Sequence, residues 1–432
     1  MLSIGKLNSK ISVIKKMPDL RKRIIFTLVI LLVARIGVHI PSPGVDISKL
    51  TNMVKSSGLL SMFNLFSGGA FSRASIFALG VLPYIDASII MQLMGVVVPK
   101  IEEIQKEGDQ GQEKVLQWTR YLTIAIAIVQ SIGVSVWLIA MHMVTTPNLF
   151  LFIFTTVTIL TAGSMFLMWI GEQITVYGVG NGISIIIFVN IISRVPAMLF
   201  QLVTILKESA FSIMIMKLVF LALFFILVTL AVVIVQLGER RIPVQYAGKG
   251  FGGNNKIASR TYIPLKLAMA GVIPIIFAYV ILMMPMFIVN LIPSTGLLLP
   301  VKTFLGSVFA YNSATYLIFE FLIVVFFSFF YTAIVFDPEK VAENLKQGGG
   351  AVPGVRPGKE TELYLEKVTL RITTVGSIFL GVVAILPNIF SIISGLPMIV
   401  SGIGLLIIVG VALDTVQQVD AHLVMREYEG IY

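Results

Sequence analysis

The chain has 432 residues, of which 57% are apolar and only 12% are charged, against about 25% charged residues in ordinary soluble domains. Its mean hydropathy is +0.95, which is more apolar surface than one soluble core of this size could bury. The absence of cysteine and the presence of only three histidines exclude a disulfide scaffold, thiolate chemistry and a histidine-based metal site. We therefore expect a polytopic membrane protein with no metal and no other cofactor.

Long apolar stretches predict membrane-spanning helices, because about 20 apolar residues cross the hydrocarbon core of a bilayer. Their runs lack the alternation that is typical of barrel strands. The ten predicted spans are residues 24–40, 76–98, 121–144, 148–171, 183–200, 214–237, 263–292, 314–336, 372–390 and 396–417. The seventh is the longest and is expected to be tilted. An even number of spans puts both termini on the same side of the membrane.

The basic residues indicate which side that is. Twenty-four of the 32 lysines and arginines lie in the N-terminal segment, in loops 99–120, 238–266 and 337–371, or at the C-terminus. Lysine and arginine are retained on the cytosolic side of membrane proteins. We therefore place both termini in the cytosol and interpret the net charge of +10 mainly as a topology signal.

One external segment departs from the simple pattern of spans and loops. Residues 59–70 (LLSMFNLFSGGA) form an amphipathic stretch that is too short to span and ends at two glycines. One interpretation is an interfacial helix that lies on the membrane. The other is a re-entrant stopper inside a pore, since such half-helices are tolerated only within protein or along a cavity. The spacing alone leaves both open.

The two large cytosolic loops, 238–266 and 337–371, are rich in glycine and basic residues. They are expected to be either exposed tips that bind a partner or solvated loops that only enforce topology. Residues 353–359 (PGVRPGK) resemble a phosphate-binding loop, but Pro353 and Glu360 stand where that motif needs glycine and serine or threonine. The sequence therefore predicts no ATP site and no enzyme activity.

Besides a pore with a stopper, two classes of function remain open: a proton-coupled transporter and a passive scaffold. Asp86 and Glu320 lie inside predicted spans, and intramembrane carboxylates are typical of proton-coupled transporters with inverted repeats. A passive scaffold without a sealed pore is the third class.

Several motifs together resemble the SecY family, the channel-forming subunits of the bacterial Sec protein translocase. The resemblance runs essentially end to end. The motifs that carry it are RIG at 35–37, IPSPG at 40–44, FSGGA at 66–70, SRASIF at 72–77, PYI at 83–85, WIGEQI at 169–174, GNGIS at 180–184, GVIP at 271–274 and PGVRPG at 353–358.

The resemblance implies an all-α membrane protein of ten transmembrane helices in two pseudo-symmetric inverted halves around a central pore. The N-terminal half is expected to be residues 1–205, with the plug at 59–70, and the C-terminal half residues 206–432, with both large loops. The implied function is a protein-conducting channel in the cytoplasmic (inner) membrane. It would translocate unfolded secretory polypeptides across that membrane and release hydrophobic segments laterally into it.

The resemblance also implies roles for particular residues. The pore ring would be Val81, Ile85, Ile183, Ile187, Ile276 and Ile407, and the plug would include Phe63, Asn64, Phe66, Ser67, Gly68 and Gly69. Gln92 and Gln130 would lie at a lateral gate, between spans two and three on one flank and seven and eight on the other. Arg240, Arg241, Arg356 and Lys359 would bind partners. The implied partners are the SecE and SecG subunits, the SecA ATPase, ribosomes (whose RNA is the one nucleic acid within reach), signal sequences, unfolded preproteins and membrane lipid.

Physical chemistry explains why these residue types suit a channel for unfolded chains. Branched apolar side chains form a deformable constriction that excludes hydrated ions by dewetting, and adjacent glycines give a plug conformational freedom. Asp86 follows a ring position, but one residue along a helix turns a side chain by about 100°. We therefore expect Asp86 to pack or pair away from the pore.

Overall fold

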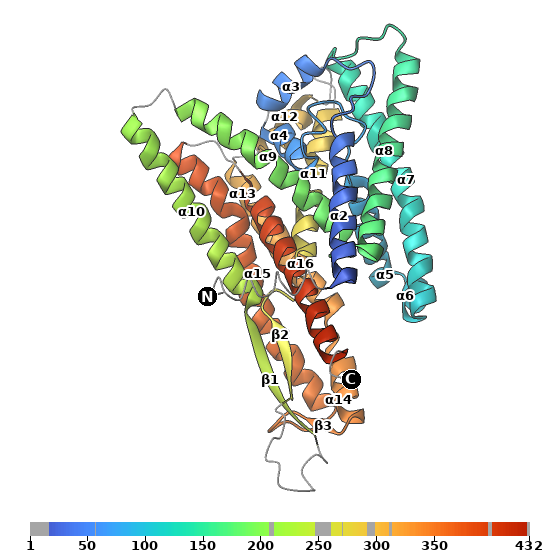
Figure 1. Ribbon diagram of the computed structural model, residues 1–432, viewed down its shortest axis with the longest axis vertical. Coiled ribbons are helices and arrows are strands. Elements are labelled where there is room, and N and C mark those ends of the chain that lie inside the picture. The colour runs from blue at the N-terminus through green and yellow to red at the C-terminus, as the bar shows by residue number, and fades with distance from the viewer. Residues whose placement is uncertain are drawn as a thin grey trace. The chain divides into compact units, whose positions relative to one another are not determined.

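The computed structural model of this chain (Figure 1) describes residues 17–56, 58–206, 211–246, 261–269, 271–291, 299–310, 313–395 and 400–429. The chain divides into two compact units. Unit 1 comprises residues 1–205, 280–313 and 411–432, and unit 2 comprises residues 206–279 and 314–410. Helices α11 (Ile273–Leu291) and α16 (Gly402–Glu429) contribute residues to both units. The division into contiguous halves 1–205 and 206–432 stays a prediction.

Unit 1 is built from helices. They are α2 (Pro18–Gly37), α3 (Ile47–Ser56), α4 (Gly58–Phe66), α5 (Leu82–Val97), α6 (Pro99–Lys106), α7 (Asp109–Ala140), α8 (Leu149–Tyr177), α9 (Gly182–Leu206) and α12 (Leu299–Val308), together with the second parts of α11 and α16. The long helices α7 and α8 run side by side, and α5 packs on α7 (Figure 1).

A buried cluster ties the external segment of unit 1 to its long helices. Leu50 of α3 and Phe71, which follows α4, pack with Trp137 of α7 and Phe152 of α8. The ring of Phe71 stacks on that of Trp137 at 5.9 Å between centroids. Buried side chains of α3 and of the turns that follow α4 therefore pack against the long helices of unit 1.

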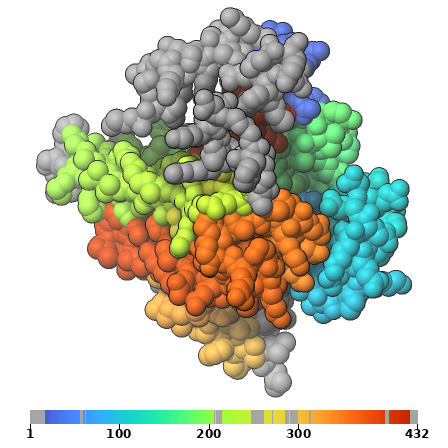
Figure 2. Space-filling view, turned by 90° about the horizontal axis from the view of Figure 1, so that it is seen from below, coloured from blue at the N-terminus to red at the C-terminus, as the bar shows by residue number. Residues whose placement is uncertain are grey.

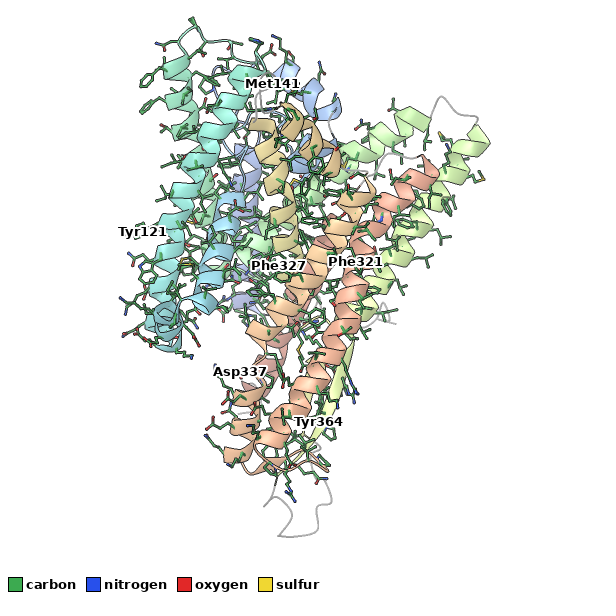
Figure 3. The ribbon with its side chains drawn as sticks, turned by 180° about the vertical axis from the view of Figure 1, so that it is seen from behind. Tyr121, Met141, Phe321, Phe327, Asp337 and Tyr364 are labelled. Atoms are coloured by element: carbon green, nitrogen blue, oxygen red, sulfur yellow. The ribbon has the colours of Figure 1, made fainter. Side chains whose placement is uncertain are left out.

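Unit 2 combines long helices with a small sheet. Its elements are α10 (Phe211–Leu237), β1 (Glu239–Tyr246), β2 (Thr261–Lys266), α13 (Ala314–Val335), α14 (Pro338–Gln347), β3 (Gly350–Ala351) and α15 (Lys359–Ser394), with the first parts of α11 and α16. Helices α13 and α15 pack along each other; Figure 3 labels Phe321 and Phe327 on α13 and Tyr364 on α15. Gly381 of α15 permits this close approach, because a Cβ there would lie 2.7 Å from Phe321 Cδ2.

The sheet has the antiparallel order β2–β1–β3. Ile242 pairs with Ile263 in β2, and Gln245 pairs with Ala351 in β3. Buried Ile242 and Leu265 pack with Leu365 on α15, so the sheet is fixed to the helices of unit 2.

Among the described residues, seven helices are long and apolar enough to cross a membrane, namely α7, α8, α9, α10, α13, α15 and α16. Helices α5 and α6 are bent by 100° at the break between them and give an eighth if the pair is one span. The first predicted span contains α2, in which an apolar stretch lies between Arg23 and Arg35, and the seventh contains α11. Each predicted span thus contains a described helix, which is consistent with ten.

Several predicted boundaries are wrong. The seventh span begins in strand β2 rather than in a helix, because residues 261–266 pair with β1. Residues 76–81 form turns, and α5 begins only at Leu82, after Gly80 with φ of +61° and with Pro83 in its first turn. Loops 99–120, 238–266 and 337–371 contain α6, the start of α7, the hairpin, α14 and the start of α15. The hairpin tip, residues 247–260, lies outside the described residues.

Candidate functional site

Four of the predicted ring positions lie in unit 1, at the first turns of two helices. Val81 is the N-cap of α5 and Ile85 follows one turn later; both side chains are buried. Ile183 and Ile187 occupy the start of α9, at a spacing that puts them on one helical face. Ile187 is buried, whereas Ile183 is partly buried and lies against Gly171 of α8.

The other two ring positions belong to unit 2. Ile276 lies in the first turn of α11 and Ile407 lies in α16, and both are buried. Before Ile407, Gly402 lies so close to the carbonyl of Ala384 on α15 that a Cβ would overlap it. The ring of six stays a prediction, with four members in one unit and two in the other.

The predicted plug residues form α4 and the turn that follows it. The turn is closed by backbone hydrogen bonds from Ser67 N to Phe63 O at 3.0 Å and from Gly69 N to Asn64 O at 2.8 Å. Gly68 and Gly69 have φ of +66° and +91°, a conformation that favours glycine. The side chain of Asn64 is 1% exposed, and its Oδ1 accepts a hydrogen bond from Ser72 N at 2.9 Å. The end of α4 is therefore inside unit 1.

Side chains from two neighbouring helices hold this turn. Asn190 Nδ2 on α9 donates to Phe66 O at 3.1 Å, and Arg35 Nη1 on α2 donates to Gly68 O at 3.2 Å. Arg194, one turn after Asn190, lies against Gly69, where a Cβ would be 3.0 Å from its Nη1. The sequence reasoning gave these three residues no role. The signal that was available is the placement of polar and charged side chains in otherwise apolar helices.

The two predicted gate residues behave differently. Gln130 Nε2 on α7 donates to Asp86 Oδ2 on α5 at 2.6 Å. Gln92 Nε2 donates to Ser88 Oγ one turn earlier in the same helix, at 3.1 Å. Asp86 is only 9% exposed, and the hydrogen bond from Gln130 pairs its carboxyl with the neighbouring helix α7. A buried polar group needs such a partner, because an unsatisfied one costs about 1–3 kcal/mol.

The predicted partner-binding residues lie around the sheet of unit 2. Arg240 and Arg241 are on β1, and Arg356 and Lys359 stand between β3 and the first turn of α15; all four are exposed. Pairing of β1 with β3 joins the two loops that were predicted separately. Figure 2 shows the surface of β1 and of the α14 to α15 region facing the viewer. Within unit 2, this surface is accessible to a partner.

Arg241 differs from its neighbour because it is already engaged. Its Nη2 lies 2.6 Å from Glu239 Oε1, and its guanidinium stands 4.7 Å from the ring centroid of Tyr262. The hydrogen bond to Glu239 raises the pKa of Arg241. Arg240 forms no ion pair with the residues that the structure describes, and its side chain is exposed.

Two carboxyl groups, those of Asp86 and Glu320, lie inside helices that are predicted to span the membrane. Glu320 on α13 is fully buried, and its Oε2 accepts from Asn388 Nδ2 on α15 at 3.2 Å. Asp86 and Glu320 belong to different units, and each accepts a hydrogen bond from an amide of a neighbouring helix. The described residues contain no group of three or more histidine, aspartate or glutamate side chains that could hold a metal ion.

Several known proteins similar to this chain carry the same name. A protein of Halalkalibacterium halodurans called protein translocase subunit SecY is 42% identical over 428 residues, which covers 97% of this chain and 98% of that protein. The protein of the same name from Escherichia coli K12 is 41% identical over 421 residues, covering 95% and 93%.

Solved structures resemble the fold. A protein-conducting channel matches with a TM-score of 0.64 and 18% identity, covering 95% of this chain and 96% of that one. Sec61 in the canine ribosome-channel complex from the endoplasmic reticulum matches with a TM-score of 0.63 and 17% identity, with the same coverage. The model of the SecY family matches residues 75–416. With near-complete coverage at about 40% identity to known members, the chain belongs to the SecY family of protein translocase subunits.

Proposed function

We propose that this chain forms the pore of a protein translocase, through which unfolded polypeptides cross the membrane. The observation that carries the proposal is the buried end of α4, a short helix that cannot span a membrane and is held by Arg35 and Asn190. Its burial favours a stopper over an interfacial helix. Relatives at about 40% identity carry the name of translocase subunits.

The constriction is proposed to be the six branched residues Val81, Ile85, Ile183, Ile187, Ile276 and Ile407. Four of them lie at the first turns of α5 and α9. Helix α9 also carries Asn190, which holds the plug turn, and Gly80 just before α5 lies against Ser67 of that turn. Branched apolar side chains exclude hydrated ions by dewetting and bind no passing sequence tightly. Such a constriction closes around chains of any sequence, as a channel for many substrates requires.

Lateral release of apolar segments is the second part of the proposal. The flank formed by α5 and α7 is joined by the bond between Gln130 and Asp86. A segment of about 20 apolar residues gains free energy by leaving for the lipid, whereas a polar segment continues across. Gln92 and Gln130 are the polar groups that we assign to this flank.

The proposed partners are the SecE and SecG subunits, the SecA ATPase, ribosomes and preproteins with signal sequences. Support comes from the exposed basic residues Arg240, Arg356 and Lys359 on unit 2, and from the fold shared with a Sec61 chain whose structure is described as a ribosome-channel complex. The distribution of basic residues supports a cytoplasmic membrane location with both termini in the cytosol. Energy would come from these partners.

Reconstitution tests the proposal directly. The chain is placed in liposomes with SecE and SecG, and SecA, ATP and a radiolabelled unfolded preprotein are added outside. We expect preprotein to become protected from added protease only when ATP is present. Protection that is equal with and without this chain would contradict the proposal. A passive scaffold without a pore would give this equal protection.

A further inference from the structure

Three arginines surround the plug turn and form what we call the arginine cluster. Arg35 comes from α2, Arg73 from the turns after α4, and Arg194 from α9. All three belong to unit 1 and are partly buried. They lie close enough that the charges of Arg73 and Arg194 act on Arg35, and the charge of Arg73 acts on Arg194. Three like charges thus share one site.

The groups that the cluster contacts in the described residues are neutral. Arg35 Nη1 donates to Gly68 O at 3.2 Å and approaches Asn190 Oδ1 at 3.5 Å. Arg73 Nη1 and Arg194 Nε are buried and have no hydrogen-bond partner among the residues that the structure describes. None of the ion pairs among the described residues includes Arg35, Arg73 or Arg194. Two buried donors and three positive charges are therefore uncompensated.

Such an arrangement is costly unless a ligand completes it. Like charges that are partly buried without a counter-charge repel one another, and a buried donor without an acceptor adds its own desolvation cost. Guanidinium groups present a planar fork of donors that matches the oxygens of phosphate-like anions in a bidentate manner. Arginines from three separate segments of the chain therefore form a better site for an oxyanion than for a single-point ligand.

We propose that the arginine cluster binds a phosphate-type oxyanion beside the Gly68–Gly69 turn. The anion accepts hydrogen bonds from the buried donors of Arg73 and Arg194 and offsets the mutual repulsion of the three charges. It thereby links α2, the turn and α9. The binding site stands on the side-chain arrangement alone, whereas the consequence that the anion locks the plug rests on the proposed function.

Thermal unfolding of the purified full chain in lipid-free detergent tests the site. Sodium phosphate replaces sodium chloride at constant ionic strength, and the unfolding midpoint is followed. We expect the midpoint of the unsubstituted chain to rise with the phosphate concentration, because a ligand that binds only the folded state stabilises it by an amount that grows with the logarithm of the ligand concentration above the dissociation constant. Arg73→Gln and Arg194→Gln lose the rise. Arg371→Gln, the same change at an exposed position of α15, keeps it.

Two further arms make the outcome decisive. Arg73→Lys and Arg194→Lys retain the charge if the glutamine variants do not fold, and are expected to need roughly tenfold more phosphate, a loss of about 1.4 kcal/mol of binding free energy. Nanodiscs with or without phosphatidylglycerol, free of inorganic phosphate, show whether a lipid headgroup supplies the same oxyanion. The proposal is overturned if neither source raises the midpoint of the unsubstituted chain, or if all variants shift equally. No preprotein is present, so this result is independent of the translocation assay.

Discussion

Gln130 on α7 donates a hydrogen bond of 2.6 Å to Asp86 on α5, and so joins two neighbouring helices of unit 1 inside an apolar environment. Asp86 follows Ile85 directly, yet its carboxyl is directed to α7. A charged residue next to a proposed constriction is thereby kept as a link between helices.

Removal of the Gln130 amide is expected to destabilise the chain. Gln130→Leu leaves the buried carboxyl of Asp86 without this donor, at a cost of about 1–3 kcal/mol. The measurement is the unfolding midpoint in detergent. Gln117→Leu is the matched control, because Gln117 lies on the same helix and its amide contacts Tyr121 at the exposed surface (Figure 3 labels Tyr121). Equal midpoints in the two variants would contradict the role given to the link.

Asp86→Asn separates a channel from a proton-coupled transporter. Asparagine keeps an oxygen that accepts from Gln130, so we expect preprotein translocation into liposomes to be retained. A carboxylate relay, in contrast, needs a titratable group at this position. Complete loss of transport in Asp86→Asn, with normal folding, would favour the transporter.

The clamp on the plug turn predicts a leak when it is removed. Asn190→Ala takes the donor from Phe66 O, and a loss of 1.4 kcal/mol in closure corresponds to about a tenfold increase in the open fraction. We expect higher small-ion conductance in planar bilayers. Asn148→Ala removes an exposed amide that caps α8 and has no hydrogen bond to the plug turn, and it is expected to leave conductance unchanged. A similar increase in conductance in both variants would contradict the assignment of Asn190 as a residue that holds the plug turn.

The constriction predicts leaks of its own. Ile85→Gly, Ile276→Gly and deletion of residues 63–69 each remove part of the proposed seal, so each is expected to raise chloride and potassium conductance in bilayers. Ile90→Gly, on the same helix as Ile85 but 39% exposed, serves as the control. Unchanged conductance in all three test variants would count against a sealed pore in this chain.

The two adjacent arginines of β1 are expected to differ in partner binding. Arg241 is engaged by Glu239 and Tyr262, whereas Arg240 presents its charge to the solvent. Arg240→Gln should therefore weaken binding of the SecA ATPase more than Arg241→Gln does, as measured by titration against nanodisc-embedded protein. The salt dependence of the affinity should also decrease in Arg240→Gln. Equal losses in both variants would show that the contact with Glu239 is not relevant to docking.

Asp46 gives a pH-dependent prediction outside the membrane-spanning helices. Hydrogen bonds from the Ser48 hydroxyl and the Lys49 backbone amide lower the pKa of Asp46 at the start of α3. The folded state therefore gains stability from the ionised form above the unfolded pKa of about 3.9, and loses it as the pH falls through the lower folded value. We expect amide exchange in α3 to accelerate there, and Asp46→Asn to remove that dependence while keeping an N-cap acceptor.

The sequence predicts those helices whose bounds are set by the length of an apolar stretch. It does not predict elements whose stability depends on contacts between residues far apart in the chain. The predicted span 314–336 nearly matches α13 (Ala314–Val335), because apolar length sets both. Helix α15 begins at Lys359 rather than at 372, because Thr361, Leu365 and Val368 bury one face of a polar-looking segment. Strands β1 and β2 are missed since their stability comes from each other and from α15.

The same division applies to the candidate site. The glycines of the plug turn are visible as a motif, and the turn does need them. The residues that hold the turn are not, because Arg35 and Asn190 are separated from each other by 155 positions and meet only in the folded chain. The pairing of Asp86 is predictable in kind from helical geometry, but its partner Gln130 is not.

The pairing of β1 with β3 has a mechanical consequence. The two loops that carry the proposed partner-binding residues are joined in one sheet by the pairing of β1 with β3. This sheet packs through Ile242 and Leu265 on Leu365 of α15. A force on one strand is therefore transmitted to the other. It also acts on α15, which packs along α13 at Gly381. Force applied at β1 or β3 would thus reach the helices of unit 2 through side-chain packing.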